Sequence, residues 1–129
     1  MSISLISLNV NGIRDKEKRL TLFKWLQEKN TDLCLLQETH GECIEDVNMW
    51  CNEWGGTIYS AFGSNMSRGV AIMFKPKLAL DHKVIETDVE GRFLILELSV
   101  DEKKYVVINI YAPNNRRQRE LFFKKSKNM

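Results

Sequence analysis

The chain has 129 residues, of which 43% are hydrophobic and 28% are charged. This balance is typical of one folded globular domain and excludes a disordered chain. The formal net charge of +2 is too small to indicate nucleic-acid binding by itself. The three cysteines form no CxxC pair and indicate neither a disulfide framework nor a zinc ribbon. No apolar segment approaches the roughly 20 residues that span a bilayer. We therefore expect an intracellular protein with reduced thiols and no membrane association.

Apolar periodicity and turn residues predict strands mixed with helices along the chain. The predicted strands span residues 3–10, 32–37, 57–62, 69–74, 83–87, 92–100 and 105–111, and the predicted helices span 16–29, 42–54 and a segment beginning near 115. Asp15 is the expected N-cap of the first helix, and Asn30 its terminator. Segment 3–10 has few charges, which predicts a central strand. The β-branched run 106–110 predicts a strand covered on both faces. The order of elements predicts one layered α/β domain over residues 1–129.

Polar side chains follow three of the predicted strands at the point where each strand ends. The clusters are 9–12 (Asn-Val-Asn-Gly), 37–40 (Gln-Glu-Thr-His) and 109–114 (Asn-Ile-Tyr-Ala-Pro-Asn). Carboxylate and amide oxygens suit magnesium, which takes one or two protein carboxylates and keeps several waters. Phenol and amide donors can orient a phosphodiester oxygen. From the residues alone, two interpretations stay open: a metal and phosphate site, or ordinary strand-end turns in which Glu38 is a surface or capping acid.

Four motifs in order resemble the endonuclease/exonuclease/phosphatase superfamily. They are SLNVNGIR (7–14), LCLLQETH (33–40), SRGVAIMF (67–74) and NIYAPN (109–114). Together with DVEGRFLILEL (88–98) and NNRRQRELFF (114–123), they are most similar to the apurinic-type endonuclease domain of LINE-type (non-LTR) retrotransposons. The resemblance implies a four-layered α/β sandwich in which two mixed sheets are flanked by helices. It also implies a nuclease that hydrolyses DNA phosphodiesters with Mg²⁺ or Mn²⁺, and a nuclear location if the chain follows the family.

The resemblance also implies roles for individual residues. Glu38 would be the principal metal-ligating carboxylate, and Asn9 would help bind the same metal. Tyr111 would hydrogen-bond the scissile phosphate with support from Asn114. Repair-type relatives carry an aspartate where this chain has Asn11, so this residue favours the retrotransposon branch over abasic-site repair. We expect a structural or DNA-proximal role for His40.

Two later family motifs, an Asp-x-Asn pair and a Ser-Asp-His, do not follow these residues. The fifteen residues after Asn114 contain no aspartate and no histidine. The chain therefore resembles the N-terminal half of the domain, and we expect an uncovered sheet face that favours self-association. We also expect weak or no nuclease activity, because the groups that activate water are missing.

The tail after position 114 is rich in cations and offers a second interpretation. Arg116, Arg117 and Arg119 are candidates for contacts with the DNA backbone, with binding that weakens as salt rises. A solvated helix face is the alternative for this tail. Three functions thus stay open: a retrotransposon-type endonuclease domain, a non-catalytic remnant that binds DNA or protein, and a repair-type or phosphatase member of the superfamily.

Overall fold

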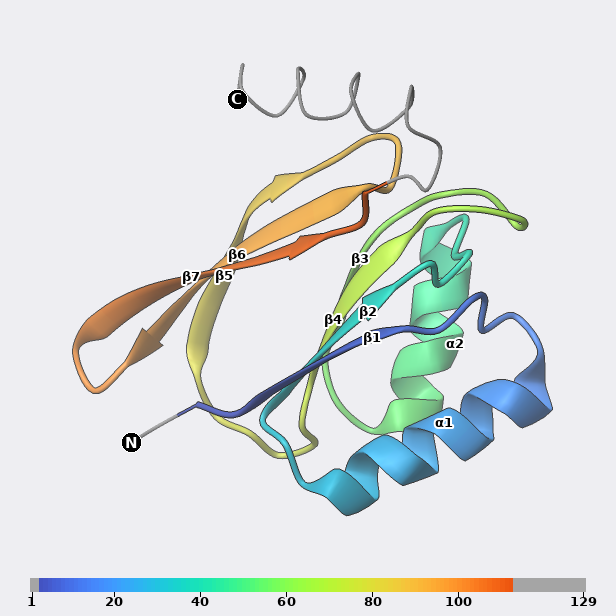
Figure 1. Ribbon diagram of the computed structural model, residues 1–129. Helices are drawn as coiled ribbons and strands as arrows, with labels where there is room; N and C mark the ends of the chain where they lie inside the picture. Colours follow the sequence, from blue (N-terminus) through green and yellow to red (C-terminus); the bar gives the residue numbers. More distant parts are fainter. Residues whose placement is uncertain (1–2, 113–129) are drawn as a thin grey trace.

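A computed structural model describes residues 3–112 of the chain, and Figure 1 shows the arrangement of its helices and strands. The helices are α1 (Lys16–Lys29) and α2 (Ile44–Trp54). The strands are β1 (Leu5–Asn9), β2 (Leu33–Gln37), β3 (Ile58–Ala61), β4 (Val70–Phe74), β5 (Asp81–Thr87), β6 (Phe93–Val100) and β7 (Lys103–Ile110). The helix predicted near residue 115 lies outside the described residues.

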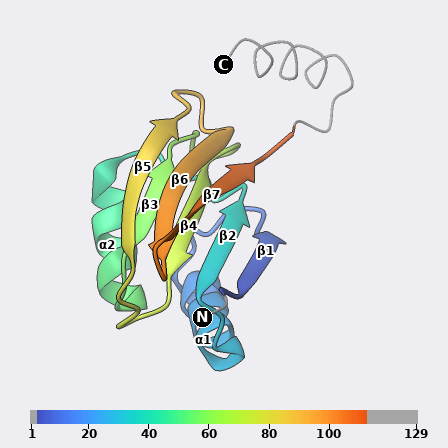
Figure 2. The same ribbon diagram turned by 90° about the vertical axis from the view of Figure 1, so that its left-hand side faces the viewer.

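The strands form two sheets that pack face to face. The first has the order β1-β2-β4-β3, with β1 and β2 parallel and the other pairs antiparallel, and the second is the antiparallel meander β5-β6-β7. Both helices cover the face of the first sheet that points away from the second (Figures 1 and 2). The described residues therefore form helix, sheet and sheet layers, which confirms the predicted layered α/β class.

Strands β2 and β4 are the core of the molecule because both of their faces are covered. On β2, Cys34 and Leu36 pack beneath the helices, whereas Leu33 and Leu35 pack against the second sheet. Every residue of β4 is buried. An apolar residue at each successive position is the sequence pattern that a doubly covered strand requires.

The prediction that the β-branched run 106–110 is covered on both faces was wrong for the described residues. Val107 and Asn109 are buried against the first sheet, but Val106, Ile108 and Ile110 are 59%, 50% and 47% exposed. Within residues 3–112, β7 pairs with β6 alone and forms an edge of its sheet. Side chains alternate between the faces of a strand, and no element of residues 3–112 covers the β-branched residues on the outer face of β7.

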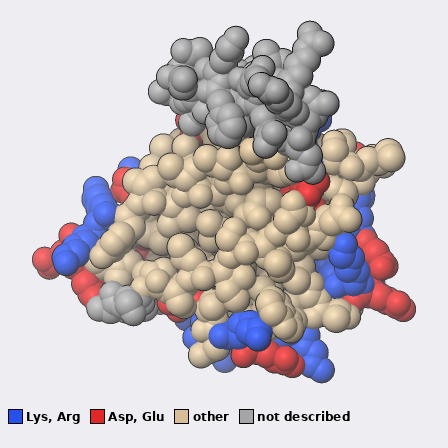
Figure 3. All heavy atoms as spheres, viewed as in Figure 1, with Lys and Arg blue, Asp and Glu red and all other residues tan. Residues whose placement is uncertain are grey.

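The prediction of a central strand at 3–10 was also wrong for the described residues, where β1 pairs with β2 alone. In Figure 2 β1 and β7 lie on the same side of the two sheets. Figure 3 views the molecule toward these two edges, and the middle of this face carries few charged side chains. The two sheets are thus open along one common side.

A buried arginine ties the two helices and the loop after β1 together. Arg19 on α1 donates from Nε and Nη2 to the two carboxylate oxygens of Glu53 on α2, at 2.6 and 2.8 Å. Its Nη1 donates to the carbonyls of Ile13 and Arg14 at 3.0 and 3.1 Å. Helix α1 ends, as predicted, at Asn30 in the left-handed conformation.

Candidate active site

The three polar clusters meet at one end of the paired sheets. Asn9 and Gln37 are register partners at the carboxyl ends of parallel β1 and β2. Asn109 reaches this end from the second sheet, where its Oδ1 accepts a 2.8 Å hydrogen bond from Gln37 Nε2. Segments far apart in sequence therefore place Asn9, Glu38 and Tyr111 at one edge.

Glu38 is the carboxylate at the centre of this edge. Asn9 Nδ2 donates a hydrogen bond to its Oε2, and the Tyr111 hydroxyl donates another to the carboxylate. Asn9 Oδ1 in turn accepts from the backbone N–H of Asn11 at 3.1 Å. Glu38 has a φ of +56°, a conformation that costs about 1–3 kcal/mol in a non-glycine residue and is found at over-determined sites.

The Tyr111 hydroxyl is held in its protonated form. Burial raises the pKa of Tyr111 above its ordinary value, and the negative charge of Glu38 and the hydrogen bond to it raise the pKa further. The positive charge of Arg68 acts in the opposite direction. At neutral pH the hydroxyl is thus a hydrogen-bond donor, as binding an anionic oxygen requires.

Asn109 joins the two sheets beneath this site through side-chain hydrogen bonds. Its Nδ2 donates to the carbonyls of Leu36 and Ala71, at 3.0 and 2.8 Å, and its side chain is fully buried. Gln37 Nε2 donates hydrogen bonds to Asn109 Oδ1 and to Ser7 Oγ, which extends this network to β1. Tyr111 stands two residues after Asn109, so this network fixes the second sheet at the distance that brings Tyr111 to Glu38.

We expect Asn109→Ala to lower the free energy of unfolding by about 2–4 kcal/mol. Two buried hydrogen bonds of about 0.5–1.5 kcal/mol each are lost, and the missing volume leaves a cavity. Urea unfolding measures the change. The control Asn65→Ala removes an exposed loop side chain and should stay within about 0.5 kcal/mol of wild type. An Asn109 variant as stable as that control would show that the network does not hold the sheets together.

His40 and Asn11 flank the carboxylate without contacting it in a hydrogen bond. The His40 ring packs so closely on Gly12 that a Cβ there would lie 2.5 Å from Nδ1. The backbone N–H of His40 donates to the carbonyl of Arg68 at 2.9 Å. Asn11 has a φ of +48°, and its carbonyl accepts from Lys18 Nζ at 3.0 Å. Both residues shape the loops around Glu38.

The remaining predicted site residues, Asn114, Arg116, Arg117 and Arg119, lie outside the described residues. An Asp-x-Asn sequence does occur earlier, at 46–48 on α2. There Asp46 accepts hydrogen bonds from Arg14 Nη1 at 2.6 Å and from the Glu42 N–H at 2.9 Å. This aspartate fixes the start of α2 and is not part of the strand-end site.

Two further residues of this region have roles that the sequence did not predict. Asn109 belongs to a predicted polar cluster, and its place on the same strand face as Val107 is the local signal that its side chain is buried. Arg68 lies inside the SRGVAIMF motif, but nothing in its local pattern indicates that the turn would bring it close to Tyr111. Its place depends on the pairing of β4 with β2.

The donor set of the site fits a hard divalent cation. No cluster of three or more His, Cys, Asp or Glu that could hold a metal occurs within residues 3–112. One carboxylate, Glu38, beside the carboxamide of Asn9 is nevertheless sufficient for magnesium, which keeps most of its water ligands. A zinc centre, by contrast, usually has three or four protein ligands, most of them His nitrogen or Cys sulfur.

Comparisons with known proteins agree with this geometry. A model of the Endonuclease/Exonuclease/phosphatase family matches residues 6–125. The chain is 27% identical to the Transposon TX1 uncharacterized 149 kDa protein of Xenopus laevis, covering 95% of this chain and 9% of that protein. It is 30% identical to an exodeoxyribonuclease of Bacillus subtilis (strain 168), covering 89% of this chain and 44% of the relative.

Two solved structures share the fold. The AP endonuclease LMAP from Leishmania major superposes with a TM-score of 0.71 at 18% identity, over 95% of this chain and 44% of that one. The endonuclease domain of TRAS1, a telomere-specific non-LTR retrotransposon, superposes with a TM-score of 0.66 at 10% identity, over 98% and 52%. The chain thus spans about half or less of the length of these proteins. No helix within residues 3–112 has the length and apolar character needed to cross a bilayer.

Proposed function

Since the chain belongs to the endonuclease/exonuclease/phosphatase family, we propose that its strand-end site binds a divalent metal ion and a DNA phosphodiester. The observation that carries this proposal is the meeting of Glu38, Asn9 and Tyr111, which come from three separate segments. If Glu38 were only a surface acid in a strand-end turn, these three segments would not need to meet at its carboxylate. Here the carboxylate has a carboxamide on one side and a protonated phenol on the other.

Each residue of the site has a chemical task in phosphodiester hydrolysis. Glu38 and Asn9 would hold Mg²⁺ or Mn²⁺, which, when bound, stabilises the charge that develops on the phosphoryl oxygens. The raised pKa of Tyr111 keeps its proton in place, so the hydroxyl can donate to a phosphate oxygen and orient the substrate. The Asn109 network keeps Tyr111 and Glu38 at a fixed separation.

DNA, cut in the manner of a retrotransposon endonuclease, is the substrate that we propose. The names of the exodeoxyribonuclease and the AP endonuclease support DNA as the substrate. The transposon protein and the retrotransposon endonuclease domain support the retrotransposon type. Asn11, which stands where repair-type relatives carry aspartate, favours the transposon branch over abasic-site repair. The basic residues Arg116, Arg117 and Arg119 would add contacts with the DNA backbone.

We expect the purified 129-residue chain to bind duplex DNA in the presence of Mg²⁺ without nicking a supercoiled plasmid. The groups that position and activate water in the family do not follow Asn114, and general-base catalysis alone is worth about 10²–10⁴-fold in rate. Agarose electrophoresis of the plasmid and a salt titration of DNA affinity check the two parts. Robust nicking that Glu38→Ala abolishes would contradict the expected lack of nicking. A chain that does not bind DNA at low ionic strength would contradict the proposed DNA-binding function.

The second candidate is a non-catalytic module that binds DNA or another protein through the exposed outer face of the second sheet. The exposed outer face of β7 favours it, with Val106, Ile108 and Ile110 all about half exposed. Such a patch favours self-association or contact with another protein. A monomer in sedimentation velocity at high concentration would argue against it.

A further inference from the structure

The turn that precedes β4 is fastened to the loop that carries Glu38. Thr39 N–H donates to the carbonyl of Gly69, and His40 N–H donates to the carbonyl of Arg68, both at 2.9 Å. Gly69 N–H donates to Gly91 at 2.9 Å, and a Cβ at Gly69 would lie 2.7 Å from Thr39 Oγ1. The backbone at Arg68 is therefore held in place beside Glu38, and its φ of +61° sets the direction in which its side chain leaves.

Arg68 differs from the other arginines of the described chain. Arg14 pairs with Asp46, Arg19 with Glu53, and Arg92 with Asp88 and Glu90. Within residues 3–112, no side chain forms a hydrogen bond or ion pair with Arg68, and its Nε is buried without a partner. A partly buried guanidinium with unused donors is unusual in a folded protein, because buried donors normally find acceptors.

The neighbours of Arg68 leave its donors available for a ligand. The Glu38 carboxylate accepts hydrogen bonds from Asn9 and Tyr111, and not from Arg68. The backbone hydrogen bonds to Thr39 and His40 hold Arg68 at the same edge, and its positive charge acts on the Tyr111 hydroxyl. A guanidinium presents a planar fork of donors that matches two oxygens of a phosphate.

We propose that Arg68 binds a non-bridging oxygen of the DNA phosphodiester, at the same edge as the donor Tyr111 and the proposed metal ligand Glu38. This inference rests on the proposed function and adds a residue that fixes the phosphate from a second direction. Arg68 supplies the positive charge that an anionic ligand needs here, whereas Tyr111 supplies only a neutral donor. Its task is to bind and orient the substrate.

The experiment measures the affinity of the full 129-residue chain for a fluorescent duplex oligonucleotide, with Mg²⁺, at a series of NaCl concentrations. Arg68→Gly removes the guanidinium and at the same time suits the positive φ, so this variant should fold at least as well as wild type. We expect it to lose about 0.9 from the salt slope, the value for one phosphate contact. Arg68→Lys should keep the slope but bind more weakly, because an ammonium lacks the planar fork.

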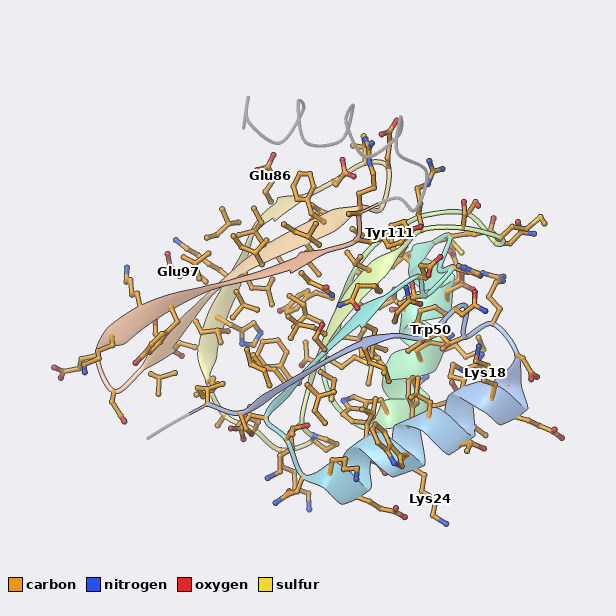
Figure 4. All side chains as sticks on the ribbon, in the orientation of Figure 1. Lys18, Lys24, Trp50, Glu86, Glu97 and Tyr111 are labelled. Atoms are coloured by element: carbon orange, nitrogen blue, oxygen red, sulfur yellow. The ribbon has the colours of Figure 1, made fainter. Side chains whose placement is uncertain are left out.

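The matched control is Lys24→Ala, which removes an exposed cation on α1. Lys24 lies at the opposite end of the molecule from Tyr111 (Figure 4), so its removal should leave the slope unchanged. If wild type binds DNA and Arg68→Gly keeps the same slope and affinity, the role of Arg68 is wrong and the proposed function survives. If wild type shows no salt-dependent binding, both fail. If Arg68→Gly unfolds at a lower urea concentration than wild type, Arg68 has a structural role instead.

Discussion

Replacing Glu38 by glutamine is expected to weaken Mn²⁺ binding by about 10- to 100-fold, since even residues that only support a metal ligand have effects of this size. The amide keeps the shape of the side chain and the same backbone strain, so the fold should be unaffected. Electron paramagnetic resonance of free Mn²⁺ gives the affinity directly. The same substitution removes the negative charge beside Tyr111, and the pKa of that phenol should fall toward its ordinary value.

A matched control for this substitution is Glu86→Gln. Glu86 is an exposed carboxylate on β5 (Figure 4), and its loss should change neither the Mn²⁺ affinity nor the alkaline absorbance titration of the tyrosines. Equal Mn²⁺ affinities for wild type and Glu38→Gln would show that Glu38 is not a ligand of the metal ion. A Tyr111 titration that is unchanged in Glu38→Gln would show that the phenol and the carboxylate are not in contact.

Substituting Arg19 by alanine is expected to lower the free energy of unfolding by about 3–5 kcal/mol, because breaking a buried ion pair leaves one charge without a partner. Arg19 is 1% exposed, and Glu53 would remain beside α1 with no cation at hydrogen-bond distance. The carbonyls of Ile13 and Arg14 would lose a donor as well. Urea unfolding with an unchanged m-value measures the loss. Lys24→Ala serves again as the exposed control.

The same ion pair should make the stability of the wild type more sensitive to acid than that of Arg19→Ala. The hydrogen bond from Arg19 is the main cause that holds the pKa of Glu53 below its ordinary value of 4.5, with burial acting against it and the charges of Arg19 and Lys16 adding to it. This contribution to stability is complete above pH 4.5 and is lost as the pH falls through the lower, folded-state pKa. In Arg19→Ala the acid loss should be smaller, and an identical loss in both proteins would contradict the pairing.

Local periodicity was sufficient for most elements, because it is determined by the neighbours of each residue in the chain. The amphipathic pattern that predicts a helix over 16–29 agrees with α1 (Lys16–Lys29), and the helix ends at the predicted terminator Asn30, which is in the left-handed conformation. Asp15 occupies the N-cap position, but its side chain makes no capping hydrogen bond. Strand exposure could not be predicted in the same way. The apolar run in β7 is compatible with a central or an edge strand, and the pairing of sheets decides between them.

The candidate site was predictable as far as its residue types and no further. Glu38, Asn9 and Tyr111 stand out because a carboxylate, a carboxamide and a phenol each follow an apolar strand. Their convergence depends on parallel pairing of β1 with β2 and on the hydrogen bonds of Asn109 between the sheets, which are long-range contacts. The position of Arg68 depends on hydrogen bonds to Thr39 and His40 across the β2–β4 pair. Apart from the place of Asn109 on the same strand face as Val107, these contacts leave no local signal in the sequence.

The most direct test of the proposed metal site is anomalous diffraction from crystals of the chain soaked in Mn²⁺. We expect one anomalous difference peak in contact with a carboxylate oxygen of Glu38 and next to the side chain of Asn9, and no peak there in Glu38→Gln crystals. Saturating Mn²⁺ that gives no peak at Glu38, or an equal peak in the Glu38→Gln crystals, would contradict the assignment of this strand end as a divalent-metal site.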